Sequence, residues 1–264
     1  IILGGYDHGI TSGSHYSTIL GGHSNSITAL GSIVGGIENS ASGLSSTVSG
    51  GRNNRASGVE SFIGGGDRDT ASGDNSVVAG GLQNTASGIQ STVGGGANNV
   101  AGTYGVISGG TFNNAGTYAT VGGGSGNIAS GGAFSTVSGG SGNTAFNGSV
   151  IGGGSSNIAT SSYATVAGGI GNVSTGNYAT VGGGQTNIAS GINSFVGGGL
   201  TDTADGQYTV VAGGRENRAA AQEATVGGGY SNLAFGTSAT VAGGYNNGAL
   251  AGSSTVAGGS NNLA

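Results

Sequence analysis

The three histidines of the chain lie close together in sequence and are the first residues that suit metal binding. His8, His15 and His23 all fall within the first two units of the repeat described below, and imidazole is a common metal ligand. They occupy different positions in that repeat, so repetition does not bring them together. We therefore expect loosely constrained first coils here and no metal site.

A second candidate is acidic. Asp67, Asp69 and Asp74 follow the three glycines at 64–66, and they resemble calcium-binding repeats rich in Gly and Asp. Those repeats place Asp in every turn at a period of about nine residues. Here the period is longer and the corresponding position is usually Asn, so we expect no calcium and no other cofactor.

Catalytic groupings are also missing from the pattern. Ser is abundant, but no Ser, His and acid set recurs in an arrangement suited to nucleophilic catalysis. The glycines at 64–66 lack the following Lys of a phosphate loop. Asp202 and Asp205 form a carboxylate pair that we interpret as solvated turn residues. The spacing leaves no room for long catalytic loops, and we predict that the protein is not an enzyme.

Composition narrows the class further. The chain has 264 residues with 65 Gly, no Pro or Cys, and a net charge of −5. Without a strict Gly-X-Y period it is not collagen, and with 6% charged residues it does not resemble a solvated disordered chain. With a net negative charge and five Lys and Arg residues, the chain lacks the basic surface that nucleic-acid binding requires. No run of 18 apolar residues exists, so we expect no membrane span.

One repeat fills the chain. Residues 46–60 give a clean unit, Ser-Thr-Val-Ser-Gly-Gly-Arg-Asn-Asn-Arg-Ala-Ser-Gly-Val-Glu, whose positions we number as columns one to fifteen. Column six marks 18 units, most of them 15 residues apart. These marker glycines are Gly5, Gly22, Gly36, Gly51, Gly66, Gly81, Gly96, Gly110, Gly124, Gly140, Gly154, Gly169, Gly184, Gly199, Gly214, Gly229, Gly244 and Gly259.

The nearly fixed columns predict an all-β fold. Column three is Val or Ile, columns five and six are Gly, and columns nine and eleven are Asn and Ala in 15 of 18 units each. Such a unit is too short for two helices, Gly-Gly weakens helices, and Thr-Val favours strands. We predict one repetitive domain over residues 1–264, a β-solenoid of about 18 coils with parallel pairing between coils. We expect this segment to be a piece of a longer fibre.

Alternation along the strands predicts the interior. If column three points inward, column one does too, and Ala of column eleven faces them from the other wall. The glycine pair allows a sharp bend, and Asn of column nine tolerates the left-handed conformation. Because columns one and eleven are small, the predicted core is thin.

Column nine has two structural interpretations. Its amides could form a ladder from coil to coil, as in stacked β structures, or each Asn could cap its own turn. The members on which we base the ladder are Asn143, Asn157, Asn172 and Asn187.

The thin core predicts self-association. Burying one Val contributes only about 1.5–3 kcal/mol, whereas ordering 15 backbones costs on the order of 15–30 kcal/mol. Columns two and four form the opposite, flat face, with Thr and other β-branched residues beside Gly, Ala or Ser. We expect this face to pack against other copies in a homotrimer, although it could also remain a solvent-exposed Thr face.

Aromatic residues gather in column fifteen, just before the strand. Since coils stack in register, they should form a stripe along one edge, and Tyr suits a half-wet position. We hypothesise that this stripe contacts a protein or glycan ligand; alternatively, the rings pack against neighbouring subunits or cover the solenoid edge. The candidate ligand-binding residues are Tyr104, Tyr118, Phe134, Tyr163, Tyr178 and Tyr208.

The unit Ser-Thr-Val-x-Gly-Gly-x-x-Asn-x-Ala-x-Gly resembles the head repeats of trimeric autotransporter adhesins, of the Yersinia adhesin and Moraxella ubiquitous surface protein type. The glycine triplets at 64–66, 94–96 and 182–184 resemble the latter. The resemblance covers essentially the whole chain. It implies a left-handed parallel β-roll, three chains per head, and display on a bacterial outer membrane for attachment to host or cell-surface ligands.

Two other functions fit parts of the pattern. Similar repeats occur in trimeric fibres, so the segment could be the structural shaft of a phage tail fibre or another extracellular fibre. A solenoid with rows of Thr could also bind ice, but an ice-binding face needs Thr in columns two and four together, and column four has none. Either fibre assignment places the segment outside the cell, on a bacterial surface or a virion tail.

Overall fold

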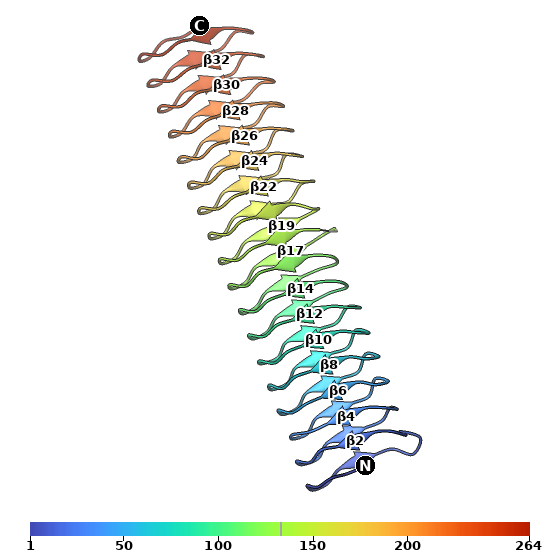
Figure 1. Cartoon of the computed structure of the whole chain (residues 1–264). Coiled ribbons are helices and arrows are strands. Elements are labelled where there is room, and N and C mark those ends of the chain that lie inside the picture. Colours follow the sequence, from blue (N-terminus) through green and yellow to red (C-terminus); the bar gives the residue numbers. More distant parts are fainter. Residues whose placement is uncertain (133) are drawn as a thin grey trace. The chain divides into compact units, whose positions relative to one another are not determined.

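The computed structural model describes residues 1–132 and 134–264, which form two units, Ile1–Ala133 and Phe134–Ala264. Each unit is a stack of coils, and each coil carries two short strands (Figure 1). No helix occurs among these residues. The predicted parallel β-solenoid with a repeat of about 15 residues is confirmed.

In the first unit, two parallel sheets run through the stack. Columns ten and eleven form β1 (Gly9–Ile10), β3 (Ser26–Ile27), β5 (Ser40–Ala41), β7 (Arg55–Ala56), β9 (Thr70–Ala71), β11 (Thr85–Ala86), β13 (Val100–Ala101), β15 (Asn114–Ala115) and β17 (Ile128–Ser130). Columns two and three form β2 (Thr18–Ile19), β4 (Ile33–Val34), β6 (Thr47–Val48), β8 (Phe62–Ile63), β10 (Val77–Val78), β12 (Thr92–Val93), β14 (Val106–Ile107) and β16 (Thr120–Val121).

The second unit repeats this arrangement. Columns two and three form β18 (Thr136–Val137), β20 (Val150–Ile151), β22 (Thr165–Val166), β24 (Thr180–Val181), β26 (Phe195–Val196), β28 (Val210–Val211), β30 (Thr225–Val226), β32 (Thr240–Val241) and β34 (Thr255–Val256). Columns ten and eleven form β19 (Thr144–Phe146), β21 (Ile158–Ala159), β23 (Val173–Ser174), β25 (Ile188–Ala189), β27 (Thr203–Ala204), β29 (Arg218–Ala219), β31 (Leu233–Ala234) and β33 (Gly248–Ala249).

Every strand pairs with its equivalent one coil away. In the first unit Val48 of β6 pairs with Ile63 of β8 in parallel, and in the second Val166 of β22 pairs with Val181 of β24. A third row of parallel bridges joins column seven of neighbouring coils. The chain makes about 16 turns, so the expected 18 coils are not confirmed. At the first marker, column three contributes only an isolated bridge, from Ile2 to Ile19.

The core contains the side chains that alternation placed there. The column-three residues from Ile19 to Val241 and nearly all column-eleven residues have no exposed surface. Ser or Ala of column one is buried beside them. The interior also holds the column-nine Asn side chains, which the sequence analysis had placed in a turn. Most coils therefore combine a thin apolar layer with one buried amide.

The two glycines of the pair have different roles. The column-six residue Gly51 has φ +82°, and a Cβ there would lie 2.2 Å from the carbonyl oxygen of Gly66. Glycine is needed at column six for both reasons. Gly50, in column five, has open space around the place of a Cβ.

The expectation that column nine takes the left-handed conformation was wrong. The residue with positive φ is the one before it, as at Asn53 with φ 57°. The chain bends at column eight and turns that side chain outward. Asn54 of column nine is then free to point inward, where it is buried.

Candidate functional site

The column-fifteen turn presents its side chain outward in the left-handed conformation. Tyr104, Tyr118, Tyr163 and Tyr178 have φ between 53° and 59°. The same conformation is found where column fifteen holds other residue types, for example Ser45 with φ 55°. The turn geometry is therefore set by the coil and accepts an aromatic ring without requiring one.

Two pairs of rings stack along the solenoid edge. Tyr104 and Tyr118 in the first unit have ring centroids 4.6 Å apart with planes 9° from parallel. Tyr163 and Tyr178 in the second unit stack at 5.4 Å and 14°. These separations follow the spacing of adjacent parallel strands, about 4.8 Å. In-register coils thus turn one aromatic position into a continuous aromatic surface over two coils.

The predicted set also contains Phe134 and Tyr208. Phe134 opens the second unit and is 70% exposed. Tyr208 is 50% exposed, and the same column on the coils to either side holds Asn193 and Glu223. Every ring of the predicted set is at least 37% exposed, so none is sealed into the core of its own chain.

A second aromatic row was missed by the sequence analysis. In column seven, the rings of Tyr230 and Tyr245 lie 5.4 Å apart, and the Arg215 guanidinium lies 5.1 Å from the centre of the Tyr230 ring. Such a cation–π contact is worth about 0.5–1 kcal/mol at an exposed site. The 15-residue spacing of these three residues was the available signal, but column seven varies so much in type that the row did not stand out.

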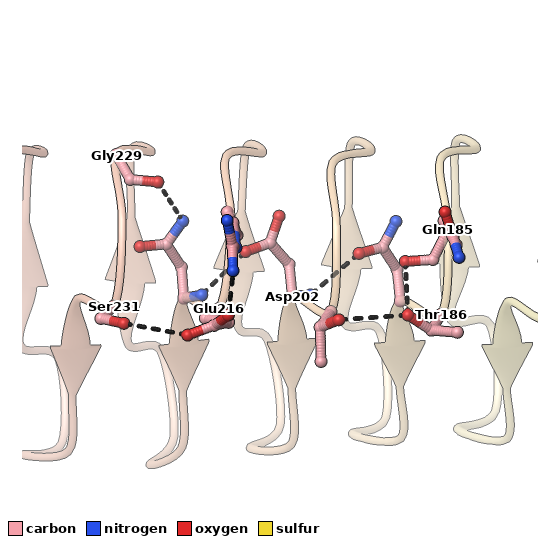
Figure 2. A network of polar contacts seen from close by, with 10 residues as sticks. Gln185, Thr186, Asp202, Glu216, Gly229 and Ser231 are labelled. Atoms are coloured by element: carbon pink, nitrogen blue, oxygen red, sulfur yellow. Dashed lines mark hydrogen bonds and ion pairs between the residues drawn. The ribbon is translucent and has the colours of Figure 1, made fainter.

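Glu216, in column eight, lies beside this row. It forms an ion pair with Arg215 at 3.0 Å. It also accepts a hydrogen bond from the Ser231 hydroxyl (Figure 2). Burial raises the pKa of Glu216, but hydrogen bonds from Arg215 and Tyr230 outweigh it and leave the pKa below its usual value. The carboxylate is therefore charged at neutral pH, and this end of the second unit carries an aromatic row with an ion pair at its edge.

The column-nine amides link each coil to both neighbours. The backbone N–H of Asn172 donates to Asn157 Oδ1 at 2.9 Å, while Asn157 Nδ2 donates to the Gly153 and Gly169 carbonyls at 2.9 Å each. The two structural interpretations are thus both realised, because one Nδ2 bond caps the turn of its own coil and the other bonds reach adjacent coils. The same pattern continues at Asn187.

The family comparison adds an identity to this geometry. Residues 46–58 match the Ubiquitous surface protein adhesin repeat. This match supports repeats of the trimeric autotransporter adhesin type. No curated protein matches the sequence. The matched stretch spans β6, the glycine pair, Asn54 and β7, and it indicates an adhesin-like, surface-exposed bacterial protein.

The adhesin repeat match ends before column fifteen. It therefore covers residues that build the coil: the buried Val48 and Ala56, the bend at Gly51 and the ladder residue Asn54. The aromatic column lies outside the matched stretch.

The sequence-based interpretation of one acidic pair was wrong in part. Asp202 is fully buried in the ladder position, so the expectation of a solvated turn residue was wrong for it. Asp205 lies nearer the surface and pairs with Arg218 at 2.6 Å. Asp202 occupies column nine, and that column points inward whatever its residue type.

The other charged and imidazole side chains make separate contacts and do not form a common cluster among the described residues. Arg52 and Asp67 form an ion pair at 2.9 Å on adjacent coils. His8 accepts a hydrogen bond at Nδ1 from the Asn25 backbone N–H, while the His23 ring stacks on Tyr6. Over residues 1–132 and 134–264, no three His, Cys, Asp or Glu side chains gather as a metal site, and no helix is long and apolar enough to cross a membrane.

Proposed function

We propose that this chain is the head of a homotrimeric adhesin, tethered to a bacterial outer membrane and attaching the cell to a protein or glycan on a target surface. It performs no catalysis. The observation that carries the proposal is the adhesin repeat at residues 46–58, set in a solenoid whose edge bears exposed, stacked tyrosines.

Self-association is supported by the column-five glycines. A Cβ at Gly168 would meet no described heavy atom within 4 Å, and φ there is outside the positive range. The single chain thus imposes no demand for glycine at this position. Ten other column-five glycines have φ between +142° and +158°, so the chain itself favours glycine there. Glycine nevertheless also fills column five where φ lies outside that range and the space around a Cβ is open. A second chain packed closely against this column would leave no space for a Cβ and would explain why glycine is found there. The members with this property are Gly4, Gly50, Gly65, Gly109, Gly139 and Gly168.

The neighbouring column two gives the same indication. Phe62 is 39% exposed and Phe195 is 41% exposed, although both lie within strands of the flat face. The thin core makes further burial of such residues valuable, at about 25 cal/mol for each Å² of apolar surface removed from water. A trimer that covers columns two to five would bury these rings.

Ligand contact is assigned to the stacked tyrosines of column fifteen. Stacking holds each ring in place before a ligand arrives, which reduces the entropy lost on binding. Each ring presents an apolar edge and a hydroxyl, the combination that makes Tyr frequent in recognition surfaces. Repetition along the edge would offer a ligand several adjacent contacts.

The test replaces Tyr104, Tyr118, Tyr163 and Tyr178 with Ser in the full chain. Ser occupies column fifteen at Ser45, Ser238 and Ser253 in the same left-handed conformation, so the variant should fold and assemble. The probe is a panel of immobilised extracellular matrix proteins and glycans. We expect the parent to bind at least one of them and the variant to lose that binding.

The matched control replaces Tyr230 and Tyr245 with Ser, which removes the column-seven rings and leaves column fifteen intact. This control should bind as the parent does. A folded quadruple variant that still binds would refute the assigned site. A parent that forms trimers but binds nothing on the panel would favour the alternative, a structural shaft of a phage tail fibre or other extracellular fibre.

A further inference from the structure

Two coils carry a carboxyl group where 15 of the 18 units carry an amide. Asp69 and Asp202 occupy column nine and are fully buried. Their Oδ1 atoms preserve the ladder, since the Asn84 N–H donates to Asp69 Oδ1 at 2.7 Å and the Asn217 N–H donates to Asp202 Oδ1 at 2.8 Å. The backbone is therefore unchanged, and the chemical difference is confined to the second side-chain atom.

That second atom, Oδ2, has no hydrogen-bond partner in either residue. In the preceding coil the equivalent atom is Asn187 Nδ2, which donates to the Gly183 and Gly199 carbonyls at 2.8 and 3.0 Å. Nitrogen and oxygen are at the same place in the two coils. A Cβ at Gly184 would lie 2.6 Å from Asn187 Nδ2, and one at Gly199 would lie 2.2 Å from Asp202 Oδ2.

The surroundings of Oδ2 are acceptors. The same Cβ position at Gly199 lies 2.4 Å from the Gly214 carbonyl oxygen, the acceptor that an amide at Asp202 would use. An ionised carboxylate has no hydrogen to donate, so its charge would face carbonyl oxygen in a site sealed from water. Leaving a buried charge without a partner is strongly unfavourable. A protonated carboxyl group resolves this, because its O–H can donate as the amide N–H does.

We propose that Asp69 and Asp202 are proton-binding sites, each holding a carboxylic acid whose O–H donates to a glycine carbonyl in the place of the amide, and that release of these protons weakens the coils around them. In Figure 2, Asp202 lies in line with the polar side chains of the adjacent coils. The reaction at each site is the exchange of one proton between the carboxyl group and water.

The charges around the two sites agree with proton retention. Burial raises the pKa of Asp202, and hydrogen bonds from Asn217 lower it only in part. Asp202 is packed between the neutral amides of Asn187 and Asn217. For Asp69, burial again raises the pKa, hydrogen bonds from Asn84 oppose it, and the charge of Asp67 raises it further.

The direction of the pH effect follows from this. A carboxyl group whose pKa is higher in the folded chain than in the unfolded chain binds its proton more tightly when folded. Its contribution to stability is complete below the unfolded value, near 3.8, and is lost as the pH rises through the folded value. The fold should therefore be more stable in mild acid than in alkaline solution.

The experiment compares thermal unfolding of the full chain between about pH 5 and pH 9 in the parent and in a variant with Asp69→Asn and Asp202→Asn. The variant carries the residue found in 15 of the 18 units and should fold. We expect the parent's melting temperature to fall on alkalinisation by roughly 3–5 °C for each pH unit and site over which a proton is released. The variant should lose this dependence.

Asp74→Asn is the control, because Asp74 is an exposed carboxylate and its removal should leave the pH dependence of the parent. Difference infrared spectra at neutral pH supply a direct readout, a protonated carboxyl band present in the parent and absent in the double variant. Equal pH dependence in parent and double variant would overturn the proposal. So would alkaline stability of the parent that rises with sodium or calcium concentration, since a cation would then occupy the site.

Discussion

Replacing one ladder amide, Asn157→Ala, should destabilise the solenoid far more than replacing a surface residue of a neighbouring column. The change removes three hydrogen bonds: two from Nδ2, to the Gly153 and Gly169 carbonyls, and one accepted by Oδ1 from the Asn172 backbone N–H. Asn157 has no exposed surface, so water does not replace these partners in the closed structure.

The magnitude follows from what is left unpaired. The Gly169 carbonyl keeps a bond from the Ser155 backbone N–H, whereas the Asn172 N–H loses the acceptor it has in the ladder. Three hydrogen bonds at about 1 kcal/mol each, with an added penalty of about 1–2 kcal/mol for the stranded donor, give a loss of roughly 4–5 kcal/mol. For a chain of this size, the melting temperature should fall by about 10 °C or more.

Two measurements check this. Thermal unfolding compares Asn157→Ala with Ser155→Ala, a column-seven change on the outside of the same coil. Amide hydrogen exchange reports on Asn172 directly, because its N–H should exchange faster in Asn157→Ala and remain protected in Ser155→Ala. Melting temperatures that agree within about 1 °C would refute the view that the ladder holds the coils together. The triple change at Asn143, Asn157 and Asn172 should exceed three surface changes by a wider margin.

Three further predictions concern the other columns. Gly168→Ala should leave each chain folded but weaken self-association, as measured by light scattering. Gly169 has φ +93°, and a Cβ there would lie 2.2 Å from a carbonyl oxygen, so Gly169→Ala should lower the melting temperature even of dilute protein. Equal effects of the two changes would contradict the separate roles of the two glycines. Val211→Ala should lower the free energy of unfolding in urea by about 2 kcal/mol, because the Val211 side chain is fully buried. A larger loss of unfolding free energy from Val210→Ala would show that the flat face contributes more to stability than the core of the single chain. The hydrogen bond from Arg52 lowers the pKa of Asp67. The contribution of this carboxylate to stability is therefore present above the pKa of the unfolded chain and disappears as the pH falls through the pKa of the folded chain. Asp67→Asn should have a slightly lower melting temperature than the parent at neutral pH and the same melting temperature in acid.

Much of the coil was predictable because its columns obey alternation. Val48 and Ala56 were placed inside on that ground, and both are buried. The same rule, applied to Ala56 in column eleven, would have placed Asn54 of column nine inside as well. The turn preference of Asn was given more weight than its position in the strand, and the left-handed residue was consequently assigned one position too late.

The rest depended on contacts between coils. The burial of Asp202 could be predicted from its column but not from its residue type, which usually marks the surface. The row of Arg215, Tyr230 and Tyr245 depends on side chains meeting across coils, in a column without a consensus. Glycine is required at Gly51 but not at Gly50. This difference depends on the φ angle and on the position of the next coil's carbonyl, and neither can be read from a Gly-Gly pair in the sequence.

The near-identity of successive coils has a consequence for how the chain finds its own alignment. If a segment shifted along the stack by one whole coil, Val would still meet Val and Asn would still meet Asn, so the core alone barely distinguishes the shifted pairing from the correct one. The irregular features do distinguish it. Arg52 would no longer lie beside Asp67, the Tyr163 ring would lose Tyr178, and the shortened coil that contains Val100 and Tyr104 would stand opposite one of normal length. These exceptions to the repeat act as alignment marks, and a chain made only of the consensus unit would have none.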